Sequence, residues 1–167
     1  LPFTDVAEGA WYYDAVAYVS ASGMMTGTNA AAFSPDAATT RAMIWTVLAR
    51  LNGQSVDGGS PWYAAAQSWA VSAGVSDGTD PAGNITREAL AAMLYRAAGS
   101  PAVSGNFLAF SDGDSVSSWA ESAMLWATQS GIIGGMDGAL APQGQATRAQ
   151  VAAMLQRFME SGGLGAE

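Results

Sequence analysis

Apolar residues recur in three segments at the spacing that places them on one face of an α-helix. The first segment carries its stripe at Ile44, Val47, Leu48 and Leu51. The stripe returns at Leu90, Met93, Leu94 and Ala97, and again at Val151, Met154, Leu155 and Phe158. Each segment follows a threonine, a favoured residue just before a helix, at Thr40, Thr86 and Thr147. The pattern therefore predicts three amphipathic helices.

A second set of helices is predicted ahead of these three. Each starts at a tryptophan, and a glycine twelve residues later can take the left-handed conformation that ends a helix. The tryptophans are Trp11, Trp62 and Trp119, and the glycines are Gly23, Gly74 and Gly131. A further glycine follows four residues on, at Gly27, Gly78 and Gly135.

These helix pairs form an internal repeat, with units at residues 1–53, 54–99 and 107–160. We call them repeats 1, 2 and 3. All basic residues of the chain fall on two equivalent positions, first at Arg41, Arg87 and Arg148 and then at Arg50, Arg96 and Arg157. One two-helix unit cannot cover both of its faces, so we expect the repeats to share a central bundle of second helices.

The repeats differ in completeness. Repeats 1 and 3 carry a Phe-x-Asp motif and a long loop with a proline six residues before the first arginine. The aspartates of the motif are Asp5 and Asp112, and the prolines are Pro35 and Pro142. Repeat 2 lacks the phenylalanine and has a shorter loop, so Asp57 is at best an approximate counterpart of the aspartates.

The composition of the chain argues against several classes of function. The chain has no Cys and no His, which removes thiol chemistry, the usual general base and the commonest metal ligand. Its net charge of −8 disfavours nucleic-acid binding. No apolar run approaches the roughly 18 residues of a membrane span. The chain begins with Leu1 and shows no signal-peptide pattern, so we expect it to be a processed or excised segment.

Two interpretations stay open for the first arginines, which directly follow the N-cap threonines. Free N–H groups at a helix start favour an anion, and an adjacent guanidinium could clamp a carboxylate. Alternatively, each arginine pairs with a Phe-x-Asp aspartate and locks neighbouring repeats. In the first case Arg→Gln weakens binding without lowering the melting temperature, and in the second case stability falls.

The second arginines lie in the last turn of their helices. For them we favour helix capping or a structural ion pair.

The tryptophans are expected mainly in the core, with a ring exposed at a ligand groove as the sharper alternative. The glycines are conformational, although Gly27 or Gly135 could let a ligand approach the backbone. No catalytic or metal-binding set is identified. The Asp112–Ser115 segment has Ala123 where a calcium loop needs a glutamate, and Glu88 and Glu121 have no acid partner.

The segment FTDVAEGAWYYDAVAYVSASGMMTGTNAAAFSPDAATTRAMIWTVLARLNG resembles an S-layer homology motif. The resemblance rests on the Phe-x-Asp-Val start, the Trp-Tyr helix start, the Gly-Met-x-x-Gly turn, the Phe-Ser-Pro loop and the Thr-Arg helix start. It extends over nearly the whole chain, with repeats 1 and 3 matching best.

The resemblance implies a mainly α fold, a pseudo-threefold three-pronged spindle of two-helix repeats around a central three-helix bundle. Its grooves would hold an anionic, pyruvylated secondary cell wall polysaccharide. Carried over by position, the glycan contacts are Arg41, Arg87 and Arg148, supported by Asp5, Asp112, Trp11, Trp62, Trp119, Gly27 and Gly135. No cofactor is implied.

The same resemblance implies a secreted, non-catalytic module that anchors a protein to the bacterial cell surface or S-layer as a monomer with intramolecular pseudo-trimer symmetry. Two alternatives remain. One is a tether that binds peptidoglycan, and the other is a protein–protein assembly module of a surface lattice, which predicts exposed apolar patches in place of Arg-lined grooves.

Overall fold

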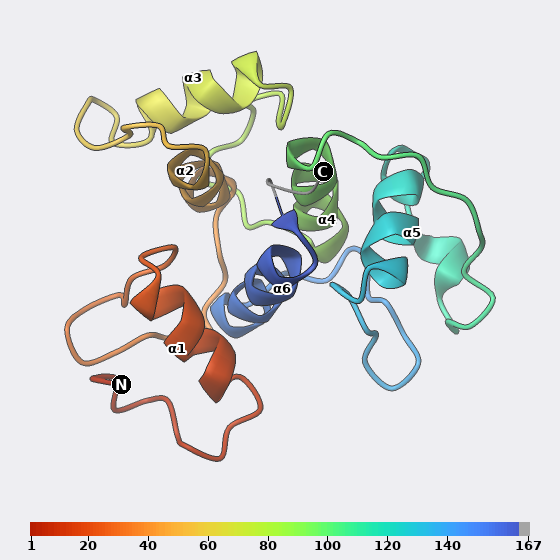
Figure 1. The fold of residues 1–167 in the computed structure, drawn as a ribbon, viewed down its shortest axis with the longest axis horizontal. Coiled ribbons are helices and arrows are strands. Elements are labelled where there is room, and N and C mark those ends of the chain that lie inside the picture. The colour runs from red at the N-terminus through yellow and green to blue at the C-terminus, as the bar shows by residue number, and fades with distance from the viewer. Residues whose placement is uncertain (164–167) are drawn as a thin grey trace.

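A computed structural model describes residues 1–163, and within them the fold is mainly α, as predicted (Figure 1). The first helices of the repeats are α1 (Tyr13–Ala21), α3 (Ala64–Ser72) and α5 (Glu121–Gln129). The second helices are α2 (Arg41–Leu51), α4 (Arg87–Ala97) and α6 (Arg148–Glu160). Two short 3₁₀ turns, η1 (Gly113–Ser115) and η2 (Ser118–Ala120), precede α5.

The predicted helix ends are confirmed at both kinds of terminus. The three threonines accept a hydrogen bond from the backbone N–H three residues on, at 3.2 or 3.3 Å, and Gln150 completes a capping box with Thr147. The first helices stop before glycines with positive φ, at Gly23, Gly74 and Gly131. Their starts were predicted two residues too early, because Trp11 and its equivalents lie in the preceding turn.

Each first helix packs on the second helix of the preceding repeat. Thus α3 lies against α2, α5 against α4, and α1 against α6, which closes the cycle. In Figure 1 the second helices occupy the middle and the first helices lie outside them. The observed pairing is cyclic, while the threefold spindle itself stays a prediction.

The starts of the second helices are joined in the same cyclic order. Isolated antiparallel bridges link Thr40 with Asn84, Thr86 with Gln145, and Thr147 with Ala38. The first two N–H groups of each second helix donate to loop carbonyls of the next repeat, as when Arg148 N–H bonds Ala37 O at 2.8 Å. The carbonyls of Pro35, Pro81 and Pro142 all take part. Repeat 2 therefore has an equivalent proline, Pro81, although the sequence analysis gave this proline only to repeats 1 and 3.

The core is continuous across the repeats. Val16 and Val19 of α1, Trp45 and Leu48 of α2, and the helix-facing residues of the other repeats are buried in it. Among the largest side chains that are fully buried are Trp45, Phe33, Phe158, Ile44, Leu90 and Met124. Because each repeat packs on its neighbours, we expect stability to be shared among all three.

Gly23→Val is expected to lower the free energy of unfolding by about 1–3 kcal/mol. Gly23 has φ of +75°, a conformation that a β-branched side chain tolerates poorly, although no atom would lie within 4 Å of an added Cβ. Chemical denaturation measures the change. Gly9→Ala is the control, since Gly9 also has open space but no positive φ, and equal stability of the two variants would contradict the argument.

Candidate functional site

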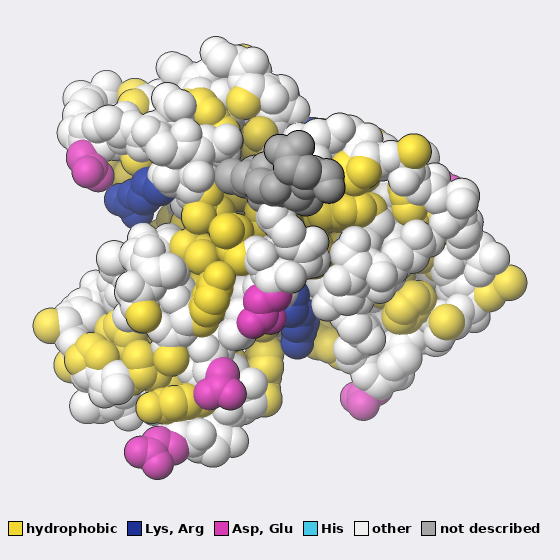
Figure 2. Space-filling model, viewed as in Figure 1, with side chains coloured by type: hydrophobic (Ala, Val, Ile, Leu, Met, Phe, Trp, Pro, Cys, Tyr) yellow, Lys and Arg dark blue, Asp and Glu magenta, His cyan; other side chains and the backbone are white. Residues whose placement is uncertain are grey.

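Three grooves run between the repeats, and they are built alike. Each is lined by a first arginine from one repeat, the second arginine and the turn after the first helix from the next repeat, and a tryptophan from the third. On the face in Figure 2, basic side chains lie in hollows between lobes. We number the grooves by the repeat that supplies the turn.

Groove 1 contains Arg148, Arg50 and Trp62, and its cavity measures about 380 Å³. Groove 2 contains Arg41, Arg96 and Trp119 and measures about 640 Å³. Groove 3 contains Arg87, Arg157 and Trp11 and measures about 480 Å³. The six arginines of the chain are thus distributed two to a groove.

The groove tryptophans are exposed, so the expectation that they are core anchors is wrong. Trp11, Trp62 and Trp119 keep 67%, 54% and 58% of their surface in contact with solvent. They precede their helices, so the helical stripe that buries the following residues does not include them. Their rings instead form one wall of each groove, which is the alternative that the sequence left open.

The first arginines reach across to the adjacent repeat and bond its backbone. Arg148 Nε donates to Phe33 O at 2.7 Å, and its Nη2 donates to Thr26 O. Arg87 Nε donates to Leu140 O at 2.8 Å. Both side chains are largely buried, and the Arg148 guanidinium also lies 4.6 Å from the Phe33 ring centroid. They therefore join repeats as well as line grooves.

The helix starts do not offer free N–H groups to an anion, which corrects that part of the sequence argument. The first two groups bind loop carbonyls, and the third binds the N-cap threonine. The N–H groups at the starts of the second helices are therefore not the groups that would bind an anion in these grooves. This occupancy depends on tertiary contacts between repeats, which the local sequence does not encode.

The aspartates of the Phe-x-Asp motif lie behind the loops and do not line the grooves. Asp5 accepts the N–H groups of Phe33 and Ser34 at 2.9 and 2.8 Å, and Asp112 does the same for Leu140 and Ala141. These backbone hydrogen bonds lower the pKa of both carboxyl groups. The predicted pairing with the arginines is therefore indirect, since Phe33 O and Leu140 O receive the arginines.

In repeat 2 a different aspartate accepts the backbone N–H of the corresponding loop. Asp77 accepts the Thr79 N–H at 3.0 Å and the Thr79 hydroxyl at 2.7 Å. Because Asp77 lies on the groove side of its loop, it also forms an ion pair with Arg41 at 3.3 Å. Asp57, the counterpart suggested by sequence, instead pairs with Arg50 at 3.5 Å.

The second arginines were assigned to capping or structural pairs, yet all three line grooves. Arg96 and Arg157 each donate to a turn carbonyl of their own repeat, Val75 O and Ile132 O, at 3.2 Å. In groove 3, the charge of Arg157 adds to the effect of burial in lowering the pKa of Arg87. Their sequence positions could have identified them as groove residues, because the second arginines recur at one repeat position as strictly as the first arginines do.

Gly27 lines groove 1 and Gly135 lines groove 3. A Cβ on Gly27 would lie 2.5 Å from the ring of Phe3, and one on Gly135 would lie 3.1 Å from that of Phe110. These glycines are therefore required for packing against the phenylalanine of the Phe-x-Asp motif, in addition to forming groove backbone.

Glu88 is a buried carboxylate with structural contacts. It accepts the Ser117 N–H at 2.9 Å and the Ser117 hydroxyl at 2.6 Å, which joins α4 to repeat 3. Within residues 1–163, no group of three or more acidic side chains is arranged to hold a metal ion. Among the helices of that same range, none combines the length and apolarity that crossing a bilayer requires.

Comparison with known proteins assigns the family. The S-layer homology domain model matches residues 2–42 and 109–152, which together make up just over half of the chain and fall in repeats 1 and 3. The chain is 29% identical to an amylopullulanase of Thermoanaerobacterium thermosulfurigenes over 96% of the chain and 10% of that protein. It is 28% identical to exoglucanase XynX of Acetivibrio thermocellus over 95% of the chain and 16% of that protein.

An endoglucanase of Bacillus sp. (strain KSM-635) is 27% identical over 95% of the chain and 19% of its own length. The chain thus spans less than a fifth of each of these relatives. Since the family model matches just over half of the chain, the chain belongs to the S-layer homology domain family, whose members anchor proteins at the cell surface.

Proposed function

We propose that this chain holds a secreted protein on the bacterial cell wall by binding an anionic secondary cell wall polysaccharide, with pyruvate ketals as the acidic groups. The observation that carries the proposal is the pairing of two arginines with an exposed indole in each groove. A guanidinium binds a carboxylate in a planar fork, and an indole offers a flat apolar face to a sugar ring.

Grooves 1 and 3 fit an anion best. The lining of groove 1 includes two arginines and no acidic side chain, although Asp57 pairs with Arg50 from outside the lining, and that of groove 3 includes two arginines and Asp36. In groove 3 neither arginine forms an ion pair within the described residues, and their mutual repulsion would be relieved by a bound carboxylate. Local charge of this kind outweighs a diffuse surface charge within a Debye length of about 8 Å.

The alternative of a lattice assembly module receives less support. Of the large apolar side chains that are exposed, three are the groove tryptophans and Met136 also lines groove 3. The others, Leu1, Val71 and Leu108, lie in separate parts of the sequence. Exposed apolar surface is thus concentrated in the grooves, together with the basic side chains.

The double variant Trp11→Ala, Trp62→Ala is expected to bind purified cell walls at least about tenfold more weakly than the parent, with an unchanged melting temperature. Both rings are mostly exposed, so their loss removes ligand contact and little packing. Sedimentation with walls measures binding, and Leu108→Ala, which removes an exposed side chain outside the grooves, is the control.

The polymer is identified by repeating the sedimentation with walls from which non-peptidoglycan polymers have been extracted. Loss of binding is expected. Retained binding would favour the peptidoglycan tether, and full binding by the double variant would reject grooves 1 and 3 as the site.

A further inference from the structure

Groove 2 differs from the other two in charge. Its lining includes Arg41 and Arg96 but also Asp77 and Asp80, so the formal charges cancel. The lining of groove 1 carries no acidic side chain, and that of groove 3 carries one. The three grooves therefore share a plan but do not present the same electrostatic surface to a ligand.

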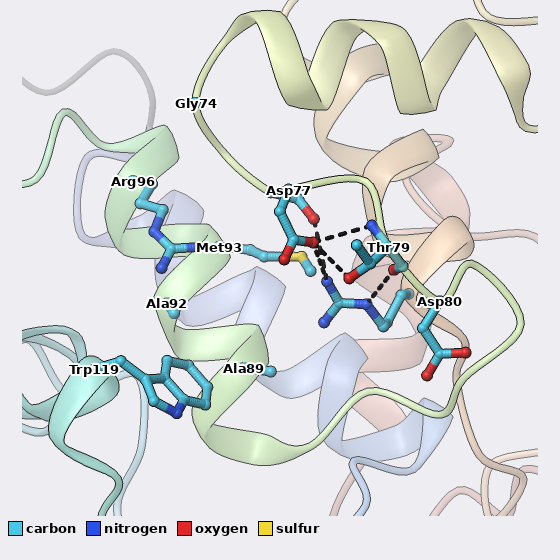
Figure 3. A pocket seen from close by; sticks show the side chains of 11 residues that line it. Gly74, Asp77, Thr79, Asp80, Ala89, Ala92, Met93, Arg96 and Trp119 are labelled. Atoms are coloured by element: carbon cyan, nitrogen blue, oxygen red, sulfur yellow. Dashed lines mark hydrogen bonds and ion pairs between the residues drawn. The ribbon is translucent and has the colours of Figure 1, made fainter.

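The first arginine of groove 2 is already neutralised by a partner. Arg41 Nε donates to Thr79 O at 2.9 Å, while Nη2 donates to Asp77 at 3.3 Å and to the Ser76 hydroxyl at 3.3 Å (Figure 3). A ligand carboxylate approaching this guanidinium would meet the carboxylate of Asp77. Like charges at such a distance repel, so the binding of an anion is opposed.

The Asp77 carboxylate is firmly held in this position. It accepts the N–H and the hydroxyl of Thr79, and these hydrogen bonds, followed by the charge of Arg41, lower its pKa. A lowered pKa keeps the group ionised at neutral pH, so the groove does not lose this negative charge under ordinary conditions.

Groove 2 nevertheless keeps the features of a ligand site. It is the largest of the three, at about 640 Å³, within the usual range of small-molecule pockets. In Figure 3 the Trp119 ring and Arg96 lie across the groove from Asp77 and Thr79, with Ala92 and Met93 of α4 between them. Trp119 is 58% exposed.

We infer that groove 2 binds an uncharged pyranose unit, in contrast to the acidic units proposed for grooves 1 and 3. Sugar hydroxyls both donate and accept, so they match a lining that offers carboxylates as acceptors and guanidinium groups as donors. The apolar face of the ring would pack on the Trp119 indole. The inference rests on the proposed glycan-binding function and assigns a different ligand class to one of its grooves.

The test uses the indole N–H signals of the intact chain in ¹⁵N NMR spectra, because each groove has its own tryptophan. Trp→Phe variants assign the signals of Trp11, Trp62 and Trp119. The neutral probes are methyl pyranosides of glucose, galactose and mannose and their N-acetyl forms, and the acidic probes are 4,6-pyruvate ketals of the same sugars. We expect neutral probes to shift the Trp119 signal and acidic probes to shift the signals of Trp11 and Trp62.

Asp77→Asn provides a second, independent measurement. The amide oxygen can still accept the Thr79 N–H, but the charge opposing an anion is lost. The affinity of groove 2 for acidic probes should rise at least about tenfold. Asp14→Asn is the matched control, since it removes the same charge from an exposed position outside the grooves and should leave the Trp119 response unchanged.

Two results would overturn the inference: a Trp119 signal that moves with acidic probes in the parent chain, or one that moves with none of the neutral probes. Failure of the proposed function looks different, because then acidic probes leave Trp11 and Trp62 unmoved whatever Trp119 does.

Discussion

The isolated third repeat, residues 107–167, is expected to show no cooperative thermal transition and little helical circular dichroism. Its two described α-helices touch through the rings of Trp126 and Phe158, whose centroids lie 6.1 Å apart, but the main partner of each helix lies in another repeat. In the full chain, α5 packs on α4 and α6 packs on α1, so excision removes the partner of both helices at once. Short helices without a packed apolar face are marginal in water.

Fragment complementation provides the control for this experiment. Adding residues 1–106 returns both α4 and α1, so helical signal should increase on mixing beyond the sum of the two fragments. A cooperative melt of the third repeat alone would show that its helices can bury each other, contrary to the cyclic pairing.

Arg148→Gln is expected to lower the free energy of unfolding by about 2–3 kcal/mol. Arg148 is 7% exposed and donates from repeat 3 to the Phe33 and Thr26 carbonyls of repeat 1, so its loss leaves the carbonyl of the buried Phe33 without this donor. Arg148→Lys should fall between the parent and Gln, because a single ammonium cannot reproduce the planar fork. Denaturant titration at neutral pH measures all three proteins.

Arg50→Gln is the matched control, since it removes the same charge from the same groove. Its pair with Asp57 is solvent-exposed on both sides, so the change should stay within about 0.5 kcal/mol. Equal stabilities of the Arg148 and Arg50 variants would mean that the hydrogen bonds between repeats contribute nothing measurable. The contacts of Arg148 and Arg87 support the interpretation in which these arginines lock neighbouring repeats.

Local signals in the sequence predicted the helices. The threonine caps, the left-handed glycines and the apolar stripes each act within one turn or one helix, so they hold whatever the tertiary arrangement. The equivalence of the repeats followed from the strict placement of the arginines. Ten site residues were carried over by position from the resemblance to the S-layer homology motif, and eight of them line grooves, while Asp5 and Asp112 hold the loops behind.

The helix partners could not be predicted, because the three second helices carry nearly the same stripe. A first helix could pack on its own second helix or on a neighbour's with a similar apolar surface. The exposure of Trp11 and the occupied N–H groups at the helix starts depend on that choice. The role of Asp77 also required the structure, since it replaces Asp5 and Asp112 from a different position in the repeat.

The contact between α1 and α6 has a consequence for the order in which the molecule is completed. During synthesis or passage through a secretion pore, α1 emerges well before residues 148–160, which form its partner. At ordinary rates of translation the interval is on the order of ten seconds. During this interval Val16 and Val19 are not yet buried as in the complete fold, and they are accessible to chaperones and proteases. A chain interrupted before residue 148 remains in that state.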